Sequence, residues 1–274
     1  MIENVDRHVL AGFCCIDAIT GTSIVDPLFV NGAPLSLRRN SSGIFAVMDA
    51  PGVDRNKAQA LIPDPVSWPK PTAYEITIND PSLRYLARRA NIQVPQPLPP
   101  PVNRGVLAPP PSTSTTPAAG PAPLPPLTTP QTVVLYPSPA APVAINWAVV
   151  RASVVSSDTP AKPLAGAVVQ VAPSEGPPPK TAIGVTNFSG EALLAVPGLG
   201  LQLSSNGSGS VIEKTTAVNV NAWFDPALLK TPPNWITNPD DILSKLTTMK
   251  TATPQTLQLA PGQSVFVTIA ISLT

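Results

Sequence analysis

Proline is concentrated in the middle of this chain, and that concentration limits what the middle can fold into. The chain has 274 residues and 38 prolines, and many of the prolines lie between Ile92 and Pro142, including the triplets at 99–101 and 109–111. Each proline lacks a backbone N–H donor and holds φ near −65°, so such a run forms neither a helix interior nor a central strand. We therefore expect an extended spacer between two folded segments.

The spacer sets the expected domain boundaries. We predict an N-terminal β-sandwich domain over residues 1–92, a proline-rich extended linker over 93–142 and a C-terminal β-sandwich domain over 143–274. Polyproline II geometry rises about 3.1 Å per residue, so a linker of roughly 50 residues can span well over 100 Å. A chain built in this way bridges distance or lies along other proteins.

Composition excludes several classes of partner. Charged residues make up 12% of the chain and the formal net charge is +1, which is unlike the basic field of a nucleic-acid-binding protein. No apolar stretch approaches the roughly 20 residues that cross a bilayer, so direct membrane insertion is not expected. Residues 1–7 are polar and do not resemble a signal peptide, which favours synthesis in the cytoplasm.

Apolar runs and alternating patterns predict strands in both folded segments. In the first segment, Asp17 is expected to hold a turn that ends at Gly21, and the adjacent Cys14 and Cys15 should face opposite sides of a strand and stay reduced. The expected strands are 7–16, 34–38, 44–48, 74–78, 92–94, 147–155, 168–171, 181–185, 192–196, 256–259 and 264–272. One helix is expected within 238–249, capped by Asn238.

The two segments repeat a local plan. A strand, an Asn-x-x-Gly turn, a second strand and a Pro-Gly stop occur in the first segment at Asn40 to Gly43 and Pro51-Gly52. The same order occurs in the second segment at Asn187 to Gly190 and Pro197-Gly198. Two small β-sandwiches, with one short helix in the second, are therefore the expected all-β architecture.

The sequence offers no recognisable catalytic machinery. His8 is the only histidine, and no nucleophile motif accompanies it. Asp240 and Asp241 are adjacent, so they are better explained as favourable charges in the first turn of a helix than as an acid–base pair. We expect a non-enzymatic protein without catalytic residues, metal ligands or a cofactor.

Two groups of residues are candidates for binding. Trp68 and Trp235 lie beside prolines in loops, where each is interpreted either as an anchor that packs back on the fold or as a platform for a glycan. Arg84, Arg88 and Arg89 form a basic cluster at the end of the first segment. This cluster is interpreted either as a solvated strand edge or as a docking contact for an acidic neighbour.

Two motifs in the second segment carry a family resemblance. The run from Pro163 to Val171, with Thr186-Asn187-Phe188-Ser189-Gly190 after it, resembles the carboxypeptidase regulatory-like domain family. That resemblance implies an Ig-like or transthyretin-like β-sandwich and a structural or adhesive role. Asn187 stands where the family usually has an acidic residue, and the first domain looks like a diverged member.

A second resemblance concerns larger assemblies. The runs at 79–86 and 190–198 are similar to proteins of phage-tail-like contractile injection systems, which assemble in the cytoplasm. This resemblance implies a structural part of the cap, tail end or baseplate, present in multiple copies and contacting sheath, tube, cap or baseplate proteins. It implies two domains that dock on neighbouring subunits, with the linker bridging them. The alternative function is an adhesion module that binds a glycan or a receptor through its loop tryptophans.

Overall fold

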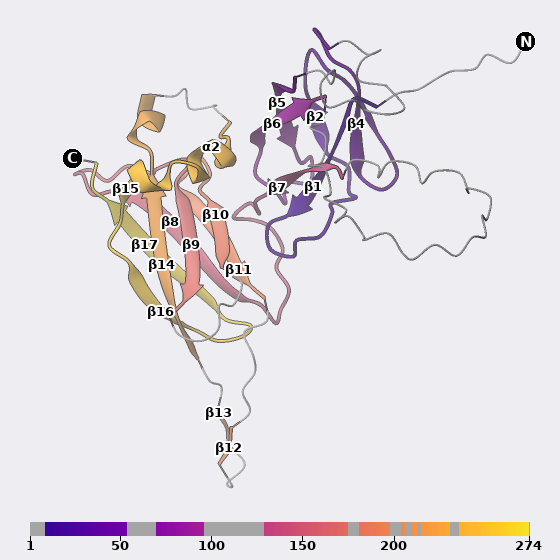
Figure 1. Ribbon diagram of the computed structural model, residues 1–274. Helices are drawn as coiled ribbons and strands as arrows, with labels where there is room; N and C mark the ends of the chain where they lie inside the picture. The colour runs from indigo at the N-terminus through magenta and orange to yellow at the C-terminus, as the bar shows by residue number, and fades with distance from the viewer. Residues whose placement is uncertain are drawn as a thin grey trace, which may run out of the picture.

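The computed structural model of the chain consists mainly of β-strands (Figure 1). The structure describes residues 9–53, 70–95, 129–174, 181–197, 204–206, 210–212, 215–230 and 236–273. The expected all-β class is confirmed over these residues. None of the helices in the described ranges is long and apolar enough to cross a membrane. We call residues 9–138 the N-terminal half and residues 139–273 the C-terminal half.

Two sheets enclose the core of the N-terminal half. One sheet has the order β3 (Ser36–Arg39), β4 (Ile44–Asp49), β1 (Ala11–Asp17) and β7 (Gln131–Leu135), and the other has the order β2 (Phe29–Asn31), β5 (Thr72–Asn79) and β6 (Arg88–Val94). Alternating apolar residues point inward, and the rings of Phe13 and Phe45 stack with centroids 4.9 Å apart. Cys15 is buried in this core while its neighbour Cys14 is half-buried, and both are free thiols as expected.

The proline-rich segment does not separate the two halves. Within the expected linker, residues 131–135 form β7, which pairs in parallel with β1 from Phe13 to Asp17. At the other end, the backbone N–H and carbonyl of Gln93 both bond to the side-chain amide of Gln131 at 2.9 Å. The described strands on either side of 96–128, β6 and β7, therefore lie beside each other in the N-terminal half. Residues 131–135, which fall inside the expected linker over 93–142, thus belong to a sheet of the N-terminal half, and the expected boundary at 142 stays a prediction.

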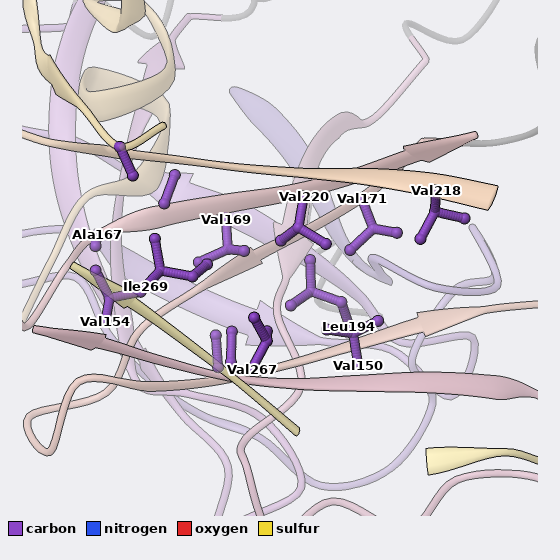
Figure 2. Packing of buried hydrophobic residues seen from close by; sticks show 14 of the residues in the cluster. Val150, Val154, Ala167, Val169, Val171, Leu194, Val218, Val220, Val267 and Ile269 are labelled. Carbon is purple, nitrogen blue, oxygen red and sulfur yellow. The ribbon is translucent and has the colours of Figure 1, made fainter. Parts of the chain in front are cut away.

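The C-terminal half contains two sheets that pack face to face. The first has the order β10 (Ala182–Val185), β9 (Val168–Pro173) and β14 (Thr216–Phe224), and both β15 (Lys250–Thr251) and β16 (Gln255–Leu259) pair with β14. The second has the order β11 (Glu191–Val196), β8 (Ala148–Ser156) and β17 (Ser264–Ile271). A separate ribbon joins β12 (Ser204–Asn206) to β13 (Ser210–Ile212). Figure 2 shows Val169, Val218 and Val220 from the first sheet above Val150, Leu194 and Val267 from the second.

The central strand β14 was not among the expected strands. Its inward residues Val218, Val220, Ala222 and Phe224 are at most 1% exposed and pack in the middle of the core. Asn219 and Asn221 alternate with them, and they interrupt the apolar run. The period-two pattern is the sequence signal that identifies this strand.

The repeated Asn-x-x-Gly turn forms in both halves with the same hydrogen bonds. The Asn40 side chain accepts the N–H groups of Ser42 and Ile44 at 3.0 and 2.9 Å, and that of Asn187 accepts the N–H groups of Ser189 and Glu191, both at 2.9 Å. Gly43 and Gly190 take positive φ angles of 80° and 75°. The sheet topology nevertheless differs, because β3 and β4 pair directly whereas β10 and β11 belong to different sheets.

The expected helix at 238–249 is shorter than predicted. Helix α2 covers Pro239–Leu243 and is capped by the Asn238 side chain, as expected. Two short 3₁₀ turns, η1 (Pro226–Lys230) and η2 (Leu246–Thr248), lie near it in the chain. Helix α2 ends at Leu243 with Ser244 as its C-cap, and Met249, the C-cap of η2, is extended and leads into β15, which pairs with β14.

Candidate interaction site at the junction of the two halves

A buried arginine connects the two halves. Arg88 begins β6, its side chain is 2% exposed, and its guanidinium donates to Asp240 Oδ2 at 2.5 Å. The same guanidinium donates to the Val134 carbonyl of β7 and to the Arg89 carbonyl at 3.1 Å. Each of its three nitrogens therefore has a partner, which a buried cation requires. Among the described residues, the acid paired with it is Asp240, which belongs to the C-terminal half.

The start of α2 brings Asp240 to this position. Asn238 Oδ1 accepts the Asp240 N–H at 3.2 Å, which fixes the first turn of the helix. One residue before this cap, the Thr237 carbonyl accepts the Arg89 N–H at 2.8 Å. A backbone bond and an ion pair thus hold the segment 237–240 against β6.

Apolar side chains extend the junction on both sides of this pair. Beneath α2, the buried residues Tyr136, Val168, Val185 and Ile242 form one cluster, and Ala18 and Leu86 pack against it. A second cluster lies on the outer face of β8 and β11, where Ile19 of the N-terminal half and Trp147 cover Val149, Leu193 and Ala195. The junction is therefore a packed contact, consistent with Figure 1, where β10 and β11 lie on the side of the C-terminal half nearest the N-terminal half.

A groove of about 480 Å³ lies along the junction and is mostly apolar. Its lining includes Leu86 and Arg88 from the N-terminal half and Val185 from the C-terminal half. Phe188 and Leu229 also line it and are 79% and 52% exposed. Such a lining can hold an apolar side chain.

The other two arginines of the expected basic cluster also have acidic partners within this chain. Arg84 pairs with Asp26 at 2.7 Å, and Arg89 lies 3.3 Å from Glu75. Arg88 is buried and paired with Asp240 of the same chain, so neither a solvated edge nor a second protein accounts for its position, and docking of the cluster to an acidic neighbouring protein stays a prediction. Trp68 and Trp235 lie outside the described residues, so their two interpretations stay predictions.

The turn before β6 depends on a buried acid, Asp80. Its carboxylate accepts the Ser82 hydroxyl at 2.6 Å and the N–H groups of Ser82, Arg84 and Tyr85 at 2.9, 2.9 and 3.2 Å. Burial acts to raise the pKa of Asp80, but these hydrogen bonds outweigh it and hold the pKa below its usual value. The carboxylate is therefore a fixed structural anion that orders the segment leading to Arg88.

A further acid links the expected Asp17 turn to this segment. Asp17 Oδ1 accepts the N–H groups of Ile19 and Thr20 at 2.7 and 2.9 Å, which confirms the predicted turn. Its second oxygen accepts the Tyr85 hydroxyl at 2.7 Å. Burial and this bond raise the pKa of Tyr85, so the phenol stays neutral and remains a donor. Ile19, which covers β11, is thus positioned by the turn that Asp17 holds.

The described residues contain no group of three or more His, Cys, Asp or Glu side chains that would hold a metal ion. The Cys15 thiol is a poor nucleophile, because burial, followed by the neighbouring Cys14, raises its pKa to about 12. His8 lies outside the described residues.

Exposed phenylalanines on edge strands are a feature that the sequence interpretation missed. Phe29 lies on β2 and is 69% exposed, and Phe266 lies on β17 and is 76% exposed. Each strand is at the edge of its sheet. The alternation of Val265, Val267, Ile269 and Ile271 is a sequence signal that places Phe266 on the outer face.

No protein-family model matches the chain, and a search of curated proteins found no match.

Proposed function

We propose that this chain is a non-enzymatic structural protein that assembles with other subunits of a contractile, phage-tail-like particle, at its cap, tail end or baseplate. The particle rests on the sequence resemblance of residues 79–86 and 190–198. In this proposal each half is a small Ig-like or transthyretin-like sandwich. The packed junction changes how the two halves are expected to dock. They bind their neighbours together, as a single unit, and residues 136–147 connect them in place of the proline-rich segment.

The observation that supports an assembly role best is the pair of exposed edge phenylalanines. Phe29 and Phe266 are large apolar side chains on edge strands, and each half contributes one of them. An unpaired strand edge offers backbone donors and acceptors to another chain, and an aromatic residue beside it adds apolar contact area. A subunit with two such edges, β2 and β17, can bind two neighbouring subunits at once.

The test replaces both edge residues in the particle-forming system. Phe29→Lys combined with Phe266→Lys should reduce incorporation of the chain into particles, measured by electron microscopy and by co-purification with sheath or tube proteins. Val25→Lys is the control, because Val25 is 61% exposed but lies in a loop and not on an edge strand. Unchanged incorporation of the double variant would contradict the proposal. Glycan binding that Trp68→Ala and Trp235→Ala abolish, with assembly intact, would favour the adhesion alternative.

A further inference from the structure

β17 is the longest edge strand that the structure describes. It has eight residues, Ser264–Ile271, and among the described strands it pairs only with β8. Figure 1 shows β17 and β16 on the side of the C-terminal half away from the N-terminal half. The outer edge of β17 is therefore not covered by the junction.

The hydrogen-bond pattern identifies which residues of β17 face outward. In a parallel pair, alternate residues of a strand bond to the same neighbour. The Val149 N–H donates to the Gln263 carbonyl and the Ser157 N–H donates to the Ile271 carbonyl, so the odd-numbered residues face β8. The backbone groups of Ser264, Phe266, Thr268 and Ala270 consequently point away from the sheet.

This edge lacks the features that usually prevent strands from pairing. No Asp, Glu, Lys or Arg follows Lys250 in the sequence, although charged residues make up 12% of the chain. Charged side chains, prolines and short length are the usual protections of an edge strand. By contrast, the edge strand β3 carries Arg38 and Arg39, and the edge strands β2 and β10 have three and four residues.

We propose that two copies of this chain join through β17, in an antiparallel pairing with two-fold symmetry centred on Val267. In this register Ser264 faces Ala270 of the second copy and Phe266 faces Thr268. Every outward-facing residue then opposes another outward-facing residue, and each such pair exchanges two backbone hydrogen bonds. The two Phe266 side chains lie on the same face as diagonal neighbours, within reach of each other.

The uncharged edge supports a second copy as the occupant. A symmetric pairing places the residues near its centre beside their own duplicates, so a charged side chain there repels its copy, whereas this strand carries no charged side chain. The pairing also covers the Phe266 ring, which is 76% exposed in the single chain. The inference rests on the proposed function, because it treats the β17 edge as an assembly contact. It adds that the partner at this edge is a second copy of the chain.

One side chain partly blocks the edge. Gln255 Nε2 of β16 donates to the Thr268 carbonyl at 3.1 Å, on the outward side. The incoming strand must displace this amide or share the carbonyl with it. Removing the amide should therefore favour pairing. Gln255→Ala is thus a variant that is expected to strengthen the dimer, whereas Phe266→Lys is expected to weaken it.

The first experiment measures self-association of the purified full-length chain by sedimentation velocity over a series of concentrations. We expect a concentration-dependent dimer, and Phe266→Lys should raise its Kd roughly tenfold or more. Val25→Lys should leave the Kd unchanged, because Val25 is 61% exposed in a loop away from β17, and Gln255→Ala should lower it. Equal thermal unfolding of the variants would show that all of them are folded. A wild-type chain that stays monomeric at every concentration overturns the proposal.

The second experiment tests the register. In a Cys14→Ser background, the combined variant Ser264→Cys and Ala270→Cys should be linked between copies by a short bismaleimide. Within one copy these two positions are about 20 Å apart along the strand, which a short linker does not span. Each single-cysteine variant should be linked far less. Efficient linking in the single variants, or none in the double variant, contradicts the register.

The results separate this inference from the proposed function. A dimer that is lost with Phe266→Lys supports the pairing, whether or not the chain enters particles. A monomeric chain whose incorporation into particles nevertheless depends on Phe266 supports the assembly role and contradicts pairing with a second copy, because the edge then binds a different subunit.

Discussion

The guanidinium of Arg88 and the carboxylate of Asp240 lie 2.5 Å apart although 152 residues separate them in the sequence. The arginine side chain is 2% exposed, whereas that of Asp240 is 57% exposed. The pair therefore joins a buried cation to an anion at the solvent-exposed edge of the junction. Removing the anion leaves the cation buried, which is the costly way to break such a pair.

Asp240→Ala should destabilise the chain by about 1–3 kcal/mol, a value below that of a fully buried pair because Asp240 is partly solvated. The measurement is urea unfolding. Asp241→Ala is the matched control, since Asp241 lies in the same first turn of α2 but is exposed. Both variants lose the same favourable interaction with the helix dipole. If the two variants lost the same free energy of unfolding, the bond between Asp240 and Arg88 would contribute nothing to stability.

Asp80→Asn should lower stability at neutral pH by about 1–3 kcal/mol, because the amide replaces one acceptor of a four-bonded carboxylate by a donor. The folded pKa of Asp80 is lowered, so its contribution is fully present above the unfolded Asp pKa of about 3.9 and is lost as pH falls through the folded pKa. The difference from wild type should therefore shrink in acid. Urea unfolding over a series of pH values measures it.

The control for this pH dependence is Asp158→Asn, because Asp158 is exposed in a bend. Its stability should follow that of the wild type at every pH. A gap between Asp80→Asn and wild type that stays constant below about pH 4 would mean that the Asp80 carboxylate has an ordinary pKa.

Replacing residues 97–128 with a short Gly/Ser loop should leave the fold intact and should change stability by less than about 1.5 kcal/mol, in the stabilising direction. The reason is that Gln93 and Gln131 are bonded to each other, so a short loop closes the gap. Thermal unfolding and protection of the Arg88–Asp240 junction from hydrogen exchange measure the outcome. Separation of the two halves in this variant would restore the spacer interpretation.

Local structure was largely predictable from the sequence. Asp17 and Gly21 indicate one turn, and Asn187 and Gly190 indicate another. Both turns form because the side-chain oxygen accepts N–H groups a few residues ahead and the glycine adopts a positive φ. The strands around Val150 and Val267 follow from runs of apolar residues. Strand β14 was missed even though its alternation is a local signal, because Asn219 and Asn221 dilute its hydrophobicity.

The sequence did not predict which strand pairs with an open sheet edge or which acid pairs with a buried arginine. The run of prolines indicates that its own residues avoid sheets, but it does not show that the chain returns to β1 as β7, since that pairing depends on which edge is open in the folded half. Arg88 reads as a surface charge until α2 supplies Asp240.

The sequence by itself determined the β class, the turns and the uncharged C-terminal strand, since these depend on residue type and short-range spacing. Only the tertiary structure decided that the two halves pack together, that Arg88 is buried and that the edge of β17 is open. These features arise from contacts between distant segments, whose free energies depend on burial and geometry that no local pattern encodes.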